Sequence, residues 1–201
     1  MKNAPQYIIG IGSSAGGHSA LKEFFHDIPP GLSAAFVVVT HLLRDHRSML
    51  PEIMEKYVVM PVERLHGIVV PEAGHVYVMP EDVLLEIRQG TLYLMPRPED
   101  YVWNQAINVF FTSLAQDQCE HAIGVVLSGM GTDGAEGALM LYRHGGEVLV
   151  QEPASAQFDS MPKAAIRTDH PDLVLPPREL GQRLAAMLQF GQQPYTAHKF
   201  Y

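Results

Sequence analysis

Residues 8–17 read IIGIGSSAGG, an apolar run that ends in a glycine-rich turn. The run predicts a buried strand over 7–11, and the apolar residues after the turn recur at helical spacing over 17–28. A β-branched run over 36–40 predicts a second buried strand. A strand, a helix and a strand within about 40 residues form a βαβ unit, which implies parallel strands joined by a right-handed crossover.

The rest of the chain continues this alternation, with one interruption over residues 57–95. Short strand patterns within it predict an antiparallel insertion beside the parallel sheet, with strands over 69–71, 74–78, 84–87 and 91–94 and a hairpin turn at 88–90. Helices are predicted over 48–56, 103–115, 135–142 and 177–188, and strands over 123–128, 148–150 and 173–175. The predicted class is α/β: a mostly parallel, doubly wound sheet with helices on both faces and an antiparallel β-hairpin insertion.

Composition and charge narrow the class of protein. With 201 residues, of which 47% are apolar and 18% charged, the chain suits one globular domain. A net charge of −8 argues against nucleic-acid binding, and no apolar run is long enough to span a membrane or to act as a signal peptide. The single cysteine, Cys119, excludes an internal disulfide framework and favours a cytoplasmic location. We expect one domain over 1–190 and a C-terminal tail over 191–201 without periodicity, as is typical of mobile termini.

Candidate functional residues gather where predicted strands end. In doubly wound sheets, ligands and reacting groups lie at the carboxyl ends of the strands. Three such ends carry glycine or polar residues: the turn 12–17, the dipeptide 40–41 and the turn 128–134.

The first turn allows three interpretations, two of which the residues support poorly. Gly10-x-Gly12-x-x-Ala15 matches a loose dinucleotide fingerprint, but His41 stands at the next strand end, where that fingerprint needs an acidic residue. The glycine spacing also matches a phosphate-binding loop, but His18 replaces the lysine that would hold the phosphates.

The third interpretation, a nucleophilic serine, fits best. Gly12-x-Ser14-x-Gly16 is typical of a sharp strand-to-helix turn that exposes a serine. A serine hydroxyl needs a base within hydrogen-bond reach, and His41 follows the neighbouring strand. A third group must orient the imidazole, and Asp133 follows another strand. The sequence therefore favours a triad of these three side chains.

Each member of the triad also has a structural explanation. Ser14 could cap the helix that follows it, and His41 could bond a backbone carbonyl. Asp133-x-x-Glu136 is a capping-box pattern at the start of the next predicted helix. The other histidines show no spacing typical of metal ligands, so no metal site is predicted.

Taken together, the motifs at 9–17, 40–41 and 127–134 resemble the catalytic domain of the chemotaxis protein-glutamate methylesterases (CheB-type). Further matching stretches lie at 74–78, 151–156 and 161–165. The resemblance covers about residues 7–190, and details such as 41–46 are most similar to the version fused to a receptor methyltransferase.

The resemblance implies an enzyme that hydrolyses glutamate methyl esters on chemoreceptors, and family members often also deamidate receptor glutamines. It implies Ser14 as the nucleophile, His41 as the base and Asp133 as the orienting acid. It also implies that the backbone N–H of Met130 stabilises the oxyanion. No cofactor is expected. The implied partners are the methylated cytoplasmic region of a chemoreceptor and, besides it, a receptor methyltransferase or a separate response regulator.

Two features depart from the family pattern. Where the family carries an Arg-Pro-Ser-Val-Asp-like segment near its active site, this chain has neutral amides at Asn104 and Asn108, which we expect to contact substrate. We also expect no N-terminal receiver domain of the kind that usually regulates the family, because 201 residues leave no room for one beside the catalytic domain. Two alternatives to an esterase stay open: a binding module that serves a receptor or methyltransferase, and a nucleotide-binding domain.

Overall fold

The computed structural model describes residues 3–40, 48–97, 105–168 and 171–190. The predictions made for His41, Asn104 and the tail 191–201 concern residues outside these ranges. None of the helices in the described ranges has the length and apolar content needed to span a bilayer.

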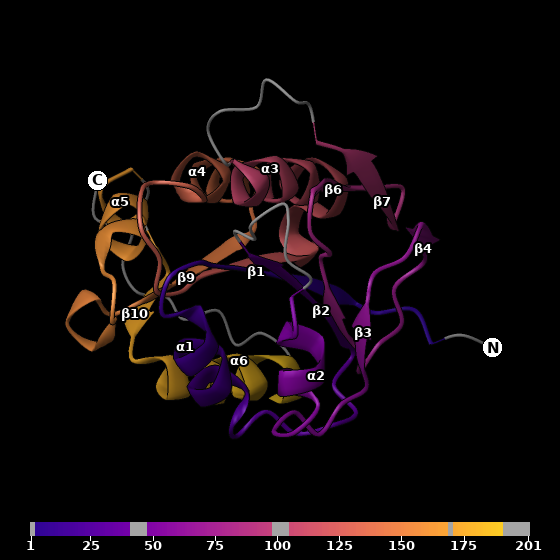
Figure 1. Ribbon diagram of the computed structural model, residues 1–201, viewed down its shortest axis with the longest axis horizontal. Coiled ribbons are helices and arrows are strands. Elements are labelled where there is room, and N and C mark those ends of the chain that lie inside the picture. The colour runs from indigo at the N-terminus through magenta and orange to yellow at the C-terminus, as the bar shows by residue number, and fades with distance from the viewer. Residues whose placement is uncertain (1–2, 41–47, 98–104, 169–170, 191–201) are drawn as a thin grey trace.

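A seven-stranded sheet lies at the centre of the molecule, and all its strands run parallel (Figure 1). Its strands, in spatial order, are β10 (Leu173–Leu175), β9 (Glu147–Gln151), β8 (Ala122–Val126), β1 (Tyr7–Ser13), β2 (Ala34–Thr40), β5 (Val76–Val78) and β3 (Val62–Arg64). Every residue of β2 and β8 is buried, as expected for parallel strands covered on both faces. The parallel part of the predicted architecture is confirmed.

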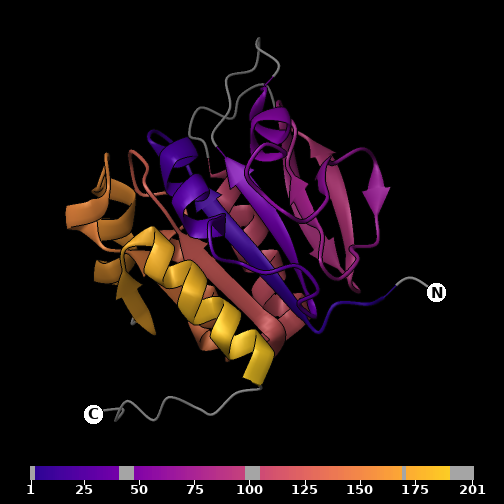
Figure 2. The same cartoon turned by 90° about the horizontal axis from the view of Figure 1, so that it is seen from below.

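Helices cover both faces of this sheet (Figures 1 and 2). One face carries α1 (Gly17–Phe25), α2 (Leu50–Met54) and α6 (Pro177–Phe190), and the other carries α3 (Ala106–Gln118), α4 (Ala135–Arg143) and α5 (Ser160–Thr168). Alternate residues of β1 face opposite ways: Ile9 and Ile11 pack in the core beneath α1 and α6, and Ile8 packs in the core beneath α3. The described residues also form two short 3₁₀ turns, η1 (Cys119–His121) and η2 (Pro153–Ser155).

The insertion forms a separate, three-stranded antiparallel sheet of β4 (Ile68–Val69), β7 (Thr91–Pro96) and β6 (Val83–Arg88). Its hairpin turns through Gln89 and Gly90, whose φ angles are both positive. The prediction was wrong for the strand at 74–78, because β5 and the unpredicted β3 join the parallel sheet. All three residues of β5 are buried, which is typical of a strand covered on both faces rather than of an exposed hairpin.

The first two glycines of the opening motif lie inside β1 and face helix α3. A Cβ atom at Gly12 would lie 2.5 Å from Cγ2 of Ile107, and one at Gly10 would lie 3.0 Å from the rings of Phe110 and Phe111. These glycines therefore let α3 pack directly on the strand. Their spacing has this packing explanation without any bound nucleotide.

The chain changes direction across the sheet between β1 and β8. From β1 it continues through α1 to β2 on one side, and from β8 it continues through α4 to β9 on the other. Because α1 and α4 cover opposite faces, the carboxyl ends of these adjacent strands form a topological switch point. The loops after β1 and β8 carry Ser14, Met130 and Asp133, and therefore meet at this point.

Candidate active site

Ser14 lies directly beyond the end of β1 in a tight turn. Its N–H donates to the carbonyl oxygen of Ser128 at 3.0 Å, and its own carbonyl accepts from the N–H of Gly17 at 2.9 Å. The N-cap of α1 is Gly16, with φ of 74° and no side-chain cap. Ser14 therefore does not cap the helix, and its half-buried hydroxyl makes no hydrogen bond to any described residue.

The loop after β8 packs against this turn. Leu127 N–H donates to the carbonyl oxygen of Gly12 at 2.9 Å, and the Ser128 hydroxyl donates to that of Ala15 at 2.9 Å. A Cβ atom at Gly129 would lie 3.0 Å from Cβ of Ser14. The backbone of this loop is thus in contact with the candidate nucleophile.

Asp133 is 6% exposed, and its carboxylate accepts three backbone hydrogen bonds. The N–H groups of Ile107, Asn108 and Gly134 each donate to it at 2.9 Å. The N-cap of the following helix α4 is Gly134, without a side-chain cap, so the capping box considered as an alternative role for Asp133 does not form. The carboxylate instead binds the N-terminus of α3, whose dipole favours a negative charge there. These bonds satisfy a buried anion and fix its orientation.

Two backbone N–H groups near Ser14 are available to a ligand. Neither Ala15 N–H nor Met130 N–H hydrogen-bonds to any residue in the described part of the chain. The Met130 side chain is 59% exposed. Free N–H groups of this kind are what an oxyanion hole requires, and in nucleophile elbows one of them comes from the residue after the serine.

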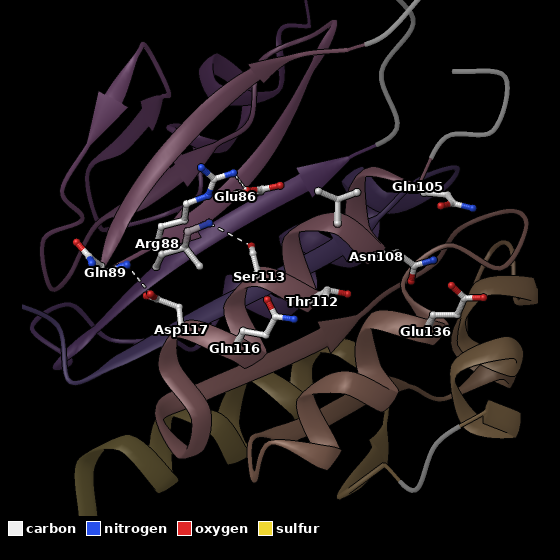
Figure 3. Close-up of a pocket in the computed structure, with 12 residues that line it drawn as sticks. Glu86, Arg88, Gln89, Gln105, Asn108, Thr112, Ser113, Gln116, Asp117 and Glu136 are labelled. Atoms are coloured by element: carbon white, nitrogen blue, oxygen red, sulfur yellow. Dashed lines mark hydrogen bonds and ion pairs between the residues drawn. The ribbon is translucent and has the colours of Figure 1, made fainter. Parts of the chain in front are cut away.

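Asn108 contacts Asp133 through its backbone N–H, but its side chain is bound to another element. Its Oδ1 accepts from Gly137 N–H of α4 at 2.9 Å. It also lines a groove of about 520 Å³ between β6 and α3, together with Gln105 and Glu136. Figure 3 shows Asn108 and Glu136 at one end of this groove.

The groove itself is separate from the switch point, because Ser14, Met130 and Asp133 do not line it. Several of its polar groups already join the insertion to α3: Ser113 Oγ accepts from Ile87 N–H, and the Asp117 carboxylate accepts from the hairpin backbone (Figure 3). The groove is therefore explained by the packing of β6 on α3.

A third segment, which sequence reasoning missed, holds the loop after β8 at Ser128 and Gly129. Ser128 N–H donates to Oε1 of the buried Gln151 at 2.8 Å, at the end of β9. Phe158 N–H donates to Ser128 Oγ at 3.0 Å, and Gly129 N–H donates to the Phe158 carbonyl at 3.0 Å. A polar glutamine at the end of an apolar strand was the available signal. Its partner lies 23 residues away, which no local pattern reveals.

The residue that follows the segment containing His41 is held by an ion-pair cluster. Ser48 N–H donates to Glu81, and Arg64 donates to both Glu81 and the Ser48 carbonyl. Burial alone would raise the pKa of Glu81, but the Ser48 N–H and Arg64 outweigh it and hold the pKa below its ordinary value. On the other side, Thr40 is buried and pairs in register with Ser13.

No group of three or more His, Cys, Asp or Glu side chains within the described ranges is placed to hold a metal ion. The expectation that the protein works without a cofactor stays a prediction.

Comparisons with known proteins agree with the resemblance. The family model described as CheB methylesterase matches residues 9–184. A protein-glutamate methylesterase/protein-glutamine glutaminase 2 of Cupriavidus metallidurans is 33% identical over 178 residues, which is 88% of this chain and 53% of that protein. A protein-glutamate methylesterase/protein-glutamine glutaminase 3 of Pseudomonas aeruginosa is 31% identical over 183 residues, 90% of this chain and 55% of that protein.

Among solved structures, the Thermotoga maritima CheB methylesterase catalytic domain matches with a TM-score of 0.81 at 26% identity. The match covers 90% of this chain and 98% of that one. By contrast, the chain spans about half the length of the curated relatives that it matches.

Proposed function

Because this chain belongs to the CheB methylesterase family, we propose that it is a serine hydrolase that removes methyl esters from glutamate side chains of chemoreceptors. One observation carries the proposal: the turn of Ser14 packs on the loop that holds Met130 and Asp133, at the switch point of the sheet. The names of the relatives also support glutamine deamidation as a second reaction of the same site.

In the proposed reaction, Ser14 Oγ attacks the ester carbonyl while His41 accepts its proton. The tetrahedral intermediate collapses to an acyl-enzyme, and methanol leaves with the proton from His41. Water then attacks the acyl-enzyme with His41 again as base, which regenerates Ser14 and releases the glutamate carboxylate. Asp133 orients the imidazole and stabilises its positive charge. A glutamine substrate would follow the same steps and release ammonia.

The backbone N–H groups of Met130 and Ala15 are the proposed oxyanion donors. Each such donor lowers the barrier by roughly 3–4 kcal/mol in other hydrolases. Asn108, whose N–H binds Asp133, and Asn104 are the proposed substrate contacts. Neutral amides at these positions would recognise substrate by hydrogen bonds rather than by charge.

We place this activity in the cytoplasm, on the methylated cytoplasmic region of a receptor. A receptor methyltransferase or a separate response regulator is the proposed regulatory partner.

One observation favours a second candidate, a binding module with an enzyme-like fold. Asn108 Oδ1 is already occupied by Gly137 N–H of α4, which leaves this side chain fewer groups for a substrate. A module of this kind would bind the receptor without hydrolysing it.

The test is methanol release from membranes that contain methylated chemoreceptors, with the native protein and Ser14→Ala. We expect release by the native protein and a loss of roughly 10⁶-fold in the variant, to the background rate. Ser19→Ala, at an exposed serine of α1, is the control and should keep full activity. No release from a folded native protein would reject the esterase and leave the binding module.

A further inference from the structure

The peptide between Gly129 and Met130 is held from one side by the start of α5. The Gly129 carbonyl accepts from Met161 N–H at 3.0 Å and from the Ser160 hydroxyl at 3.2 Å. In a planar trans peptide, the C=O and the N–H of the same unit point in opposite directions. With its carbonyl bound to α5, this peptide directs the Met130 N–H away from that helix.

The same serine also holds the next peptide. Gly131 N–H donates to Ser160 Oγ at 3.2 Å. A hydroxyl can donate one hydrogen bond and accept others, so Ser160 can donate to Gly129 and accept from Gly131 at once. One side chain thus bridges the backbone on both sides of Met130.

This bridge lies beside the candidate nucleophile. A Cβ atom at Gly129 would lie 3.0 Å from Ser14 Cβ and 2.1 Å from Met161 Sδ. The peptide is therefore confined between Ser14 and α5, and its N–H has no partner in the described chain. The only side-chain hydrogen bonds to the backbone of 129–131, among the described residues, come from Ser160.

We propose that Ser160 is a positioning residue for the oxyanion hole, which fixes the Met130 N–H in the direction that the developing charge needs. The proposal rests on the proposed esterase function. An oxyanion donor accelerates the reaction only as far as it is oriented beforehand, because reorientation during the reaction would cost free energy. Loss of the bridge should therefore weaken transition-state stabilisation and leave substrate binding unchanged.

The test compares native protein, Ser160→Ala and Ser160→Thr in two assays. One is methanol release with kcat and KM determined separately, and the other is the rate at which a fluorophosphonate labels Ser14. We expect Ser160→Ala to lower kcat and the labelling rate roughly three- to tenfold, with KM unchanged. Ser160 is exposed, so Ser160→Thr can accommodate its methyl group and should restore both rates.

Ser19→Ala is the control, since Ser19 is an exposed serine of α1 and the side-chain hydrogen bonds to the backbone of 129–131 among the described residues come from Ser160. It should leave both rates unchanged. Unchanged rates in Ser160→Ala, or a loss that Ser160→Thr does not restore, would overturn the proposed role of Ser160. Neither result would contradict the proposed esterase function.

The two assays separate this proposal from the proposed function. Native protein that is labelled at Ser14 but releases no methanol would refute the receptor substrate, and the labelling rates would still decide the role of Ser160. Native protein that shows neither reaction would refute both.

Discussion

The two loops that meet at the switch point have the same form. The loop after β1 enters α1 through Gly16, and the loop after β8 enters α4 through Gly134. These glycines adopt left-handed φ angles of 74° and 89°, and neither helix has a side-chain cap. A glycine-rich turn after a buried strand therefore specifies the backbone geometry in both places, but it does not specify the chemistry.

The loops differ in what their polar side chain does for the fold. Ser14 is half-buried, and its hydroxyl bonds no described residue. Asp133 is buried and accepts three N–H groups, two of them from the start of α3. The first side chain is thus free for chemistry alone, whereas the second also supports the packing of a neighbouring helix. Substitutions should separate activity from stability in the first loop only.

The largest expected effect comes from Asp133→Asn compared with Ser14→Ala. Asp133→Asn should lower kcat roughly 10⁴-fold, because the amide cannot stabilise a charged imidazole. It should also lower the free energy of unfolding by about 1–3 kcal/mol, since one of its two oxygens becomes a donor facing N–H groups. Ser14→Ala should remove activity and leave the free energy of unfolding within about 0.5 kcal/mol of native. Methanol release and urea unfolding measure the two quantities.

Equal stability losses in the two variants would refute the difference between the loops. The matched control for unfolding is Glu136→Gln, at an exposed carboxylate three residues further along the β8 loop and helix. It should leave kcat unchanged and lower the free energy of unfolding by less than about 1 kcal/mol, since it removes one exposed charge from the first turn of α4.

The next largest effect is a difference in unfolding free energy between Gly16→Ala and Gly131→Ala, which make the same backbone change in each loop. Both glycines have positive φ, so an alanine costs about 1–2 kcal/mol at either position. A Cβ at Gly16 would lie 2.6 Å from Ser128 Oγ, whereas a Cβ at Gly131 meets nothing within 4 Å. Crowding should therefore add about 1–3 kcal/mol to the cost of Gly16→Ala. Urea unfolding of the two variants measures the difference, and equal losses would show that the contact relaxes freely.

A smaller effect is expected where the two loops are joined, at Ser128. Ser128→Ala removes the hydroxyl that donates to the Ala15 carbonyl and accepts from Phe158 N–H. Leaving these groups unpaired should cost about 1–3 kcal/mol of unfolding free energy. Thermal unfolding against the control Ser19→Ala measures it, and a variant as stable as native would mean that water replaces the serine.

Local sequence patterns predicted most of the strands and helices of this fold. Continuous apolar runs identified β1, β2 and β8, because strands buried on both faces need no polar residue. The edge strand β3 was missed, since it has only three residues and two of them are Glu63 and Arg64. Helix α5 was missed as well, because Pro162 interrupts a run of nine residues that is too short for a clear period.

For the candidate site, the sequence predicted where the residues lie in the fold better than it predicted which groups they contact. Ser14, Met130 and Asp133 lie at the predicted strand ends, because the rule for carboxyl ends depends only on the order of the elements. The capping box that the sequence offered as an alternative role for Asp133 does not form, because the partners of its carboxylate include N–H groups of α3, 26 and 25 residues away along the chain. The role of Ser160 was not predicted for the same reason, because its two backbone partners lie about 30 residues away along the chain.

The smallest expected effect concerns the C-terminal ends of α1 and α4, the two helices that follow the loops. Helix α4 ends at Arg143 and is followed by Gly145 and Gly146, whose N–H groups donate to the carbonyls of Tyr142 and Leu141. Beyond α1, Asp27 is hydrogen-bonded to Arg178 and Gln182 of α6 and to its neighbour His26. These bonds, that of Arg178 foremost and that of His26 next, hold the pKa of Asp27 well below its ordinary value. A lowered pKa in the folded state stabilises the protein above the ordinary value of about 3.9, and this contribution declines as the pH falls below it.

Asp27→Asn should therefore lower Tm slightly at neutral pH, and its difference from native should shrink steadily below about pH 3.9. The effect is small because the ion pair is exposed and its charges are screened by water and salt. Thermal unfolding of both proteins at neutral pH and at the lowest pH where both stay folded measures it. A difference in Tm that stays constant across this range would show that Asp27 acts at the end of α1 by its shape, like the glycines of α4, and not by its charge.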